Sequence, residues 1–276
     1  MKILFLDIDG TLCEPGEQVS QVTIDALHRA QSNGHKIFIS TGRNIPSIQP
    51  FVLAIGFDGI IASAGGHIIA DGKVLEDKKM PQELLEHALK VFERHNVSYM
   101  LETDQGTYAD VEKHIKKWEN NLSTANSEMK RMMVQLLEGL GMRPLSDFDN
   151  QPVYKICFIG DNEPEVVAAI EELGDRFETV LQDNMVPDQP RINGETMEKG
   201  VDKGVAVRAI CDYYGVSLED AVAFGDSGND LPMLDVAGTA VVMGNAAPSV
   251  KEHADVVCES CHDDGIAHEL ERMGLI

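Results

Sequence analysis

Short apolar runs alternate along this chain with segments whose apolar residues recur at helical spacing. The runs Lys2–Leu6, Lys36–Ser40 and Gly59–Ala62 have the length and composition of strands, and Gln21–Asn33 and Lys203–Tyr214 have the helical pattern. Strands that alternate with helices predict an α/β fold with a largely parallel sheet. The chain has 276 residues and is 43% hydrophobic, which is enough for one large domain or two moderate ones.

The middle of the chain has a different texture from its two ends. After a predicted β-hairpin around Asp71-Gly72, segment 81–189 has its own predicted elements: a helix over Pro81–His95, a strand over Val97–Glu102, helices over 111–121 and 126–141, and strand–helix–strand order over 154–182. The Pro- and Gly-containing stretch Met185–Thr196 is predicted to be a boundary loop. We therefore predict a Rossmann-like three-layer core domain of residues 1–80 and 190–276, with a parallel sheet, interrupted by an inserted α/β domain of residues 81–189.

The charge balance excludes two classes of partner. The formal net charge is −23 at pH 7, whereas nucleic acids and anionic membranes require a basic surface. No apolar stretch approaches the ~20 residues of a membrane span, and the apolar start is too short for a secretory signal. We therefore expect a cytoplasmic protein, whose oligomeric state the sequence does not determine. A phosphorylated substrate would need local positive charge to bind here.

Two aspartates end the first predicted strand. Asp7 and Asp9 are two positions apart, so their carboxylates share one side of the strand at about 6–7 Å. Two ionised carboxylates at that distance repel by ~2–3 kcal/mol at an effective dielectric near 20. A divalent cation or a shared proton would remove this repulsion. An ordinary Asp-Gly turn is the alternative.

Further polar residues follow other predicted strands or begin helices. Thr41 and Gly42 follow the second strand, Lys203 opens a helix, and the late strand is followed by Asp226, Asn229 and Asp230. Ligands bind in the crevice at the carboxyl ends of the strands of open parallel sheets, where these residues would meet. Each of them alone is more commonly a helix cap, a turn residue or a solvated charge.

Taken in order, these stretches resemble the four motifs of the haloacid dehalogenase superfamily of phosphotransferases. The matching residues are Asp7-Ile8-Asp9-Gly10-Thr11, then Thr41, then Lys203, and last Gly225-Asp226-Ser227-Gly228-Asn229-Asp230. Only 34 positions separate Asp7 from Thr41, but 162 separate Thr41 from Lys203. An insertion between the second and third motifs resembles the Cof-type branch, which has a type IIB cap. That resemblance implies a phosphatase of small phosphorylated metabolites, often sugar phosphates.

The resemblance also implies a role for each motif residue. Asp7 would be the nucleophile and Asp9 the general acid and base. Magnesium would be held by Asp7, Asp9 and Asp226, together with the backbone carbonyl of Ile8. Phosphate or substrate would be bound by Thr41, Gly42, Lys203 and Asn229, while Asp230 would support the metal or orient Lys203. Arg43 would either reach substrate or form a salt bridge.

Three rival functions are considered. A phosphomutase with a related cap would use the same aspartate pair and would release little phosphate. A binding protein on this scaffold would not need all four motifs. A dehalogenase is disfavoured, because carbon–halogen cleavage does not require the acid that Asp9 supplies. Within the insertion, His114, Lys116, Lys117 and Trp118 are expected on a solvated helical face, so specificity is not determined.

The cysteines indicate reduced thiols. Their count is five and their positions are scattered, which is not typical of a disulfide framework. Cys258-Glu-Ser-Cys261-His262 matches the pattern of covalent haem attachment, but no export signal accompanies it. No second pair at zinc-site spacing is present either. We expect an ordinary strand end and loop there.

Overall fold

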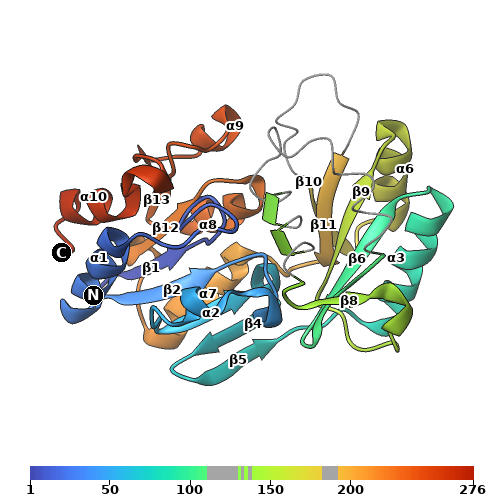
Figure 1. The fold of residues 1–276 in the computed structure, drawn as a ribbon, viewed down its shortest axis with the longest axis horizontal. Helices are drawn as coiled ribbons and strands as arrows, with labels where there is room; N and C mark the ends of the chain where they lie inside the picture. The colour runs from blue at the N-terminus through green and yellow to red at the C-terminus, as the bar shows by residue number, and fades with distance from the viewer. Residues whose placement is uncertain (111–129, 132–133, 136–138, 182–191) are drawn as a thin grey trace.

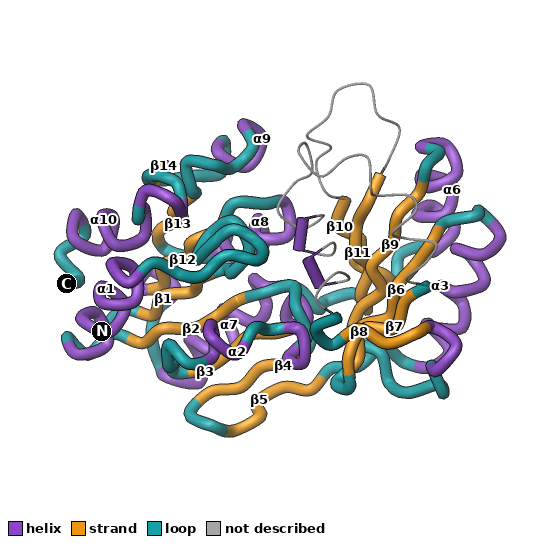
Figure 2. Tube along the Cα trace, in the orientation of Figure 1, coloured by secondary structure: helices purple, strands orange, loops and turns teal. Residues whose placement is uncertain are grey.

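Two β-sheets, each with its own helices, lie side by side in the computed structural model (Figures 1 and 2). The structure describes residues 1–110, 130–131, 134–135, 139–181 and 192–276. An eight-stranded sheet, here called the core sheet, contains strands from both ends of the chain. A six-stranded sheet, the cap sheet, contains strands between Ser98 and Glu198.

The core sheet has the strand order β14-β13-β12-β1-β2-β3-β4-β5. Its strands are β1 (Ile3–Leu6), β2 (Lys36–Ser40), β3 (Gly59–Ala62), β4 (His67–Ala70), β5 (Lys73–Asp77), β12 (Ala221–Gly225), β13 (Thr239–Val242) and β14 (Val256–Val257). The strands from β14 to β3 pair in parallel, and β4 and β5 are antiparallel. The predicted hairpin is present, with positive φ at Asp71 and Gly72.

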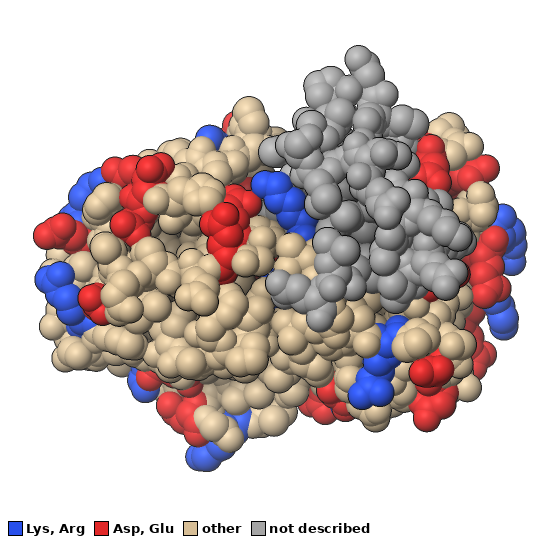
Figure 3. All heavy atoms as spheres, viewed as in Figure 1, with Lys and Arg blue, Asp and Glu red and all other residues tan. Residues whose placement is uncertain are grey.

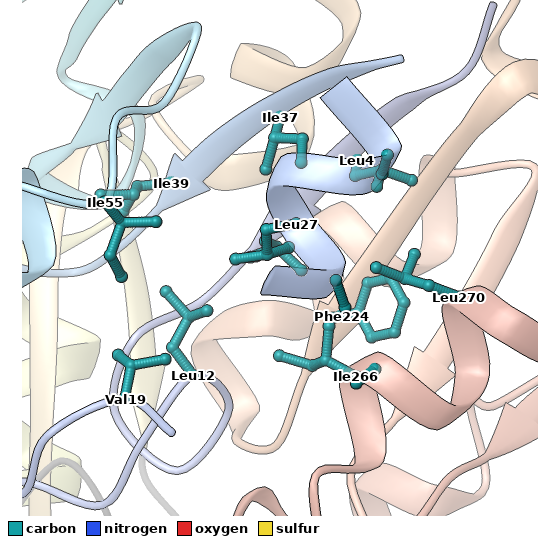
Figure 4. Close-up of a cluster of buried hydrophobic side chains, with 14 of the residues drawn as sticks. Leu4, Leu12, Val19, Leu27, Ile37, Ile39, Ile55, Phe224, Ile266 and Leu270 are labelled. Carbon is teal, nitrogen blue, oxygen red and sulfur yellow. The ribbon is translucent and has the colours of Figure 1, made fainter. Parts of the chain in front are cut away.

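Helices cover both faces of the core sheet. Leu4, Phe224 and Ile37 pack on one face against α1 (Gln21–Ser32) and α10 (Gly265–Arg272), as Figure 4 shows. The side chains of Ile3 and Phe5 point to the opposite face, against helices α7 (Lys203–Tyr214) and α8 (Leu231–Val236). All four residues of β1 are buried because both faces are covered. The predicted three-layer α/β architecture is confirmed. Two short helices complete this half: α2 (Pro50–Leu53) and α9 (Pro248–Lys251).

The cap sheet has the strand order β10-β11-β9-β6-β7-β8 and is antiparallel except for the β7–β8 pair. Its strands are β6 (Ser98–Thr103), β7 (Gly106–Ala109), β8 (Met142–Pro144), β9 (Lys155–Gly160), β10 (Phe177–Leu181) and β11 (Ile192–Glu198). Helices α3 (Gln82–Arg94) and α6 (Glu163–Leu173) contribute to an apolar cluster with Leu101, Ile156 and Phe158. That cluster defines the helix-covered face of the sheet.

Strand β11 differs from the sequence-based expectation of a loop over Met185–Thr196. Residues Ile192–Glu198 pair with β9 and β10, so the second connection between the two sheets lies after Glu198 rather than near residue 190. The segment INGETME offers few apolar residues, and its pairing partners come from elsewhere in the chain. We propose a division into a core of residues 1–80 and 199–276 and a cap of residues 81–198.

Some predicted features lie outside the described residues. These are the helix over 111–121 with His114, Lys116, Lys117 and Trp118, and most of the helix over 126–141. Among the described residues, no helix is both long and apolar enough to cross a membrane.

Candidate active site

The predicted catalytic groups converge at the carboxyl ends of adjacent core strands. Asp7 directly follows β1, and Asp230 follows β12, the neighbouring strand. Lys203 begins α7, and its Nζ lies 2.8 Å from Asp7 Oδ1 and 2.6 Å from Asp230 Oδ1. All three side chains are at most 1% exposed. Burial alone would lower the pKa of Lys203, but the carboxylates of Asp230 and Asp7 outweigh it and raise that pKa. The lysine is therefore charged.

Three carboxylates at this point could hold a cation. Asp7, Asp226 and Asp230 each offer an oxygen, and these oxygens lie within 4.8 Å of one another. Hard divalent cations such as Mg²⁺ prefer such oxygen ligands. Gly10 makes room for one of them, because a Cβ at this position would lie 2.3 Å from Asp226 Oδ2. The donor set therefore fits the cation that the sequence predicted, although Asp230 rather than Asp9 completes it.

Asp9 lies outside this carboxylate group because it is paired with Arg43. Arg43 Nε donates to Asp9 Oδ2 at 2.7 Å, and Nη2 donates to Asp9 Oδ1 at 2.6 Å. The remaining Arg43 nitrogen, Nη1, donates to the Ser47 carbonyl at 2.7 Å. Of the two roles left open for Arg43, the structure shows the salt bridge. A two-pronged pair of this kind fixes both the position and the rotation of the Asp9 carboxylate.

The backbone carbonyl of Ile8 takes part in the turn after β1. Its oxygen accepts hydrogen bonds from the amides of Thr11, Leu12 and Cys13 at 3.3, 3.0 and 3.1 Å. These bonds direct it into the turn and compete with the metal contact expected for it. In sequence, a carbonyl between two aspartates looks available, because the turn that consumes it is not visible there.

Asp230 has two structural tasks besides its contact with Lys203. Its Oδ2 accepts hydrogen bonds from the amides of Asp226 and Ser227 at 3.0 and 3.1 Å. The Asp226 side chain in turn accepts from Thr11 Oγ1 at 3.3 Å. The loop after β12 is thus held in place by its own last aspartate.

The predicted phosphate-binding residues lie on both sides of Asp7. Thr41 follows β2, is 1% exposed, and accepts a hydrogen bond from the Arg43 amide at 3.1 Å. Asn229 lies in the loop after β12 and is 3% exposed. Because β1 lies between β12 and β2 in the core sheet, these two loops flank the strand that carries Asp7.

Residues of the cap sheet reach these loops, Lys155 and Glu195 among them, and sequence reasoning missed them. Lys155 Nζ donates to the Gly42 carbonyl at 2.6 Å, and Asn229 Nδ2 donates to Glu195 Oε1 at 3.1 Å. A charged residue at the start of an otherwise apolar strand, as Lys155 is in β9, could have indicated a second functional face. Glu195, however, lay in a predicted loop.

The positive charge of the site is internal. The side chains of Arg43, Lys155 and Lys203 are at most 1% exposed. Figure 3 shows acidic side chains spread over the described part of one face of the molecule, with small groups of basic ones among them. Each of these cations is paired with at least one carboxylate, so a phosphorylated ligand in a chain of net charge −23 also requires the charge of a bound cation.

The cysteine-rich stretch near the C-terminus is a short strand followed by a loop. Cys258 follows β14 and is buried beside Met243. Cys261 and His262 belong to a single helical turn, and they bring donor atoms within 4.8 Å of a Glu14 oxygen. The two cysteines of the haem-like pattern therefore lie in different environments, one in the apolar core and one near the surface.

Comparison with known proteins identifies the family. Residues 4–270 match the model of the haloacid dehalogenase-like hydrolases. The chain belongs to this family. The match covers both sheets, and the protein is a phosphatase of the haloacid dehalogenase type.

Individual relatives cover the whole chain at low identity. The pyridoxal phosphate phosphatase YbhA of Escherichia coli (strain K12) is 28% identical, over 96% of this chain and 96% of its own length. An HMP-PP phosphatase of Yersinia pestis (strain Pestoides F) is 25% identical, over 98% of this chain and 94% of its own. The structure of the subclass IIB sugar phosphatase BT4131 matches all of both chains, with a TM-score of 0.78 and 25% identity. These relatives are named for different substrates, although each aligns with this chain over nearly its whole length.

Proposed function

We propose that this protein is a magnesium-dependent phosphatase that hydrolyses phosphate monoesters of small metabolites, sugar phosphates among them, through an aspartyl-phosphate on Asp7. One observation carries the proposal: Asp7, Asp226, Asp230 and Lys203 meet in one buried site at the strand ends. Relatives named as phosphatases of pyridoxal phosphate, HMP-PP and sugars support the general activity. They do not agree on one substrate.

In the first step, a carboxylate oxygen of Asp7 attacks the phosphorus atom. The new bond joins Asp7 to phosphorus, and the ester bond to the leaving oxygen breaks. The leaving oxygen takes a proton from the Asp9 carboxyl group. Because Arg43 donates to both oxygens of Asp9, one of these hydrogen bonds must be released when Asp9 carries that proton.

In the second step, a water molecule attacks the phosphorus of the aspartyl-phosphate. Asp9, now a carboxylate, accepts the proton from that water, and the bond between phosphorus and Asp7 breaks. Inorganic phosphate leaves, and both aspartates return to their starting forms. Lys203 holds Asp7 in position throughout and places a positive charge beside the transferring group.

The carboxylates of Asp7, Asp226 and Asp230 are the groups that would hold magnesium. Bound there, the ion supplies positive charge that offsets the repulsion among the carboxylates and the charge of the phosphoryl oxygens. Thr41, Gly42 and Asn229 flank Asp7 and can donate hydrogen bonds to phosphate oxygens.

The test is magnesium-dependent phosphate release from p-nitrophenyl phosphate by the wild type and two variants. We expect Asp7→Asn to lower kcat by ~10⁴-fold or more, and Asp9→Asn by ~10²–10⁴-fold. Asp25→Asn, on an exposed position of α1, is the matched control and should behave as wild type. Equal activity of Asp7→Asn and wild type would refute the mechanism.

A panel of sugar phosphates and other phosphorylated metabolites then addresses the substrate. Sugar phosphates are expected to give higher kcat/KM than the aryl ester. Interconversion of a sugar phosphate without net phosphate release would instead identify a phosphomutase.

A further inference from the structure

The ion pair between Lys155 and Glu195 lies on the face of the cap sheet opposite the helices. Neighbouring residues Ile156 and Phe158 of β9 belong to the helix-covered apolar cluster, so Lys155 and Cys157 point to the other face. In β11, Ile192 belongs to that cluster, which places Asn193 and Glu195 on the same face as Lys155. Lys155 Nζ and Glu195 Oε2 form the ion pair.

Both members of this pair are removed from solvent. Lys155 is 0% exposed and Glu195 is 2% exposed. Burial opposes the charged form of Lys155, but the carboxylates of Glu102 and Glu195 outweigh it and raise the pKa of the lysine. Glu102 Oε2 is 3.5 Å from Lys155 Nζ, so a second carboxylate shares the same cation. An apolar pair could stabilise a fold equally well, so stability alone does not account for these charges.

The remaining hydrogen bonds of the pair lead into the catalytic site. Lys155 Nζ donates to the Gly42 carbonyl at 2.6 Å, in the loop after β2. Glu195 Oε1 accepts from Asn229 Nδ2 at 3.1 Å, in the loop after β12. The pair therefore spans the strand that carries Asp7 and touches the loop on each side of it.

The carbonyl that accepts the hydrogen bond from Lys155 belongs to a peptide group that is linked to two site residues. It joins Gly42 to Arg43, and the Arg43 amide on its other side donates to Thr41 Oγ1 at 3.1 Å. The side chain of Arg43 donates hydrogen bonds to both carboxylate oxygens of Asp9. Rotation of this peptide would displace both the Thr41 hydroxyl and the general acid.

We propose that Lys155 and Glu195 act together as positioning residues, through which the cap aligns the two phosphate-binding loops around Asp7. This inference rests on the proposed phosphatase function and adds the part that the cap plays in it. Neither residue needs to touch the phosphoryl group. Their effect reaches the reaction through Gly42 and Asn229.

The test compares Lys155→Met, Lys155→Arg, Glu195→Gln and the double variant K155M/E195Q with wild type, using p-nitrophenyl phosphate and magnesium. Misplacement of catalytic groups by about 1 Å can cost ~10²-fold in rate, so we expect Lys155→Met to lower kcat by ~100-fold. Lys155→Arg retains a cationic donor and should restore part of the loss. Because the two residues act as a unit, the fall in kcat of the double variant should be close to that of Lys155→Met alone. It should be smaller than the product of the two single falls.

The matched control is Lys36→Met. Lys36 is at the first position of β2, the opposite end of the strand from Thr41, and pairs with Asp58 at 2.7 Å. This variant should retain the kcat of wild type. Circular dichroism and thermal unfolding of every variant distinguish misalignment from loss of fold. Should Lys155→Met prove unfolded, Lys155→Arg and Glu195→Gln carry the test.

Binding of inorganic phosphate in the presence of magnesium, measured by calorimetry, gives a readout that needs no turnover. We expect Lys155→Met to bind phosphate at least ~10-fold more weakly than wild type, because its donors are less well aligned. If Lys155→Met and Glu195→Gln are folded and have the kcat and phosphate affinity of wild type, the positioning inference is overturned and the proposed function is not. An inactive wild type would overturn the proposed function, and the phosphate-binding series would still decide the positioning role.

Discussion

The core sheet and the cap sheet present polar groups to the same site in different ways. In the core, strands β1, β3 and β12 are apolar throughout, and the predicted catalytic groups lie in the loops that follow strands, as Asp7 follows β1. In the cap, the charged groups lie on the strands themselves, as Lys155 and Glu195 do on β9 and β11. The core strands are covered by helices on both faces, whereas α3 and α6 of the cap pack on the same face of its sheet.

The difference indicates how tasks are divided. A loop at the end of a buried strand can aim several backbone and side-chain groups at one point, as the loop after β12 does with Asp226 and Asp230. A sheet face instead offers a row of side chains at fixed spacing, which is suited to contact with an opposing surface. We therefore propose that the chemistry resides in the core and that the cap aligns it.

The largest effect is expected from Arg43→Ala. This variant tests whether the loops at the ends of the core strands depend on buried salt bridges within the core. Removal of Arg43 leaves Asp9 buried without its bidentate partner. We expect a loss of ~3–5 kcal/mol in the free energy of unfolding, together with a large fall in kcat. Urea denaturation and steady-state kinetics measure the two effects. Arg94→Ala, which removes an exposed pair with Glu172, should leave both nearly unchanged.

A smaller effect is expected from Gly10→Ala, which tests the packing of the carboxylate group. Its Cβ would lie 2.3 Å from Asp226 Oδ2, so the aspartate would have to move. We expect the magnesium concentration for half-maximal activity to rise by ~10-fold or more. Gly34→Ala is a close control: its φ of +88° resembles the +87° of Gly10, but nothing lies within 4 Å of its Cβ. Equal magnesium dependence of the two variants would contradict the assigned role of Asp226.

A more modest effect is expected at alkaline pH, from a thiol that is buried in the core. Burial, and secondarily Asp212, raise the pKa of the Cys211 thiol from 9.0 to about 11. Between these pH values the folded state binds more protons than the unfolded state. The thiol therefore makes its full contribution to stability below pH 9.0, and this contribution is lost as the pH rises toward about 11. In Cys211→Ala this part of the fall disappears. Urea midpoints across that range measure it, and an unchanged pH dependence would argue against the buried thiol as its source.

The smallest effect concerns Asn193, on the same cap face as Glu195. It is 1% exposed, and neither polar atom of its side chain has a hydrogen-bond partner within the described part of the chain. A buried amide without partners costs ~1–3 kcal/mol, so Asn193→Leu should raise the midpoint of thermal unfolding slightly. A fall in kcat/KM for a sugar phosphate, with unchanged activity on p-nitrophenyl phosphate, would instead show that this face contacts the leaving group.

The core was predictable from sequence because its signals are local. The run Ile3–Leu6 ends at Asp7, and the loop after Ala221–Gly225 begins at Asp226, so each strand and its polar end are contiguous in the chain. The hairpin around Asp71-Gly72 is equally local, and it was predicted correctly. The loop expected over Met185–Thr196 did not anticipate β11, because this strand has few apolar residues and obtains its partners from β9 and β10.

Order and spacing along the chain are sufficient to specify which groups lie at the ends of the core strands. The partners of these groups depend on tertiary packing: Arg43 pairs with Asp9, Asp230 lies within the carboxylate group, and Lys155 and Glu195 from the cap contact Gly42 and Asn229. Gly42 and Lys155 are separated by 113 positions. A charge enters a buried site only if an opposite charge or a hydrogen-bonding group meets it there, and that meeting depends on how the two sheets pack together.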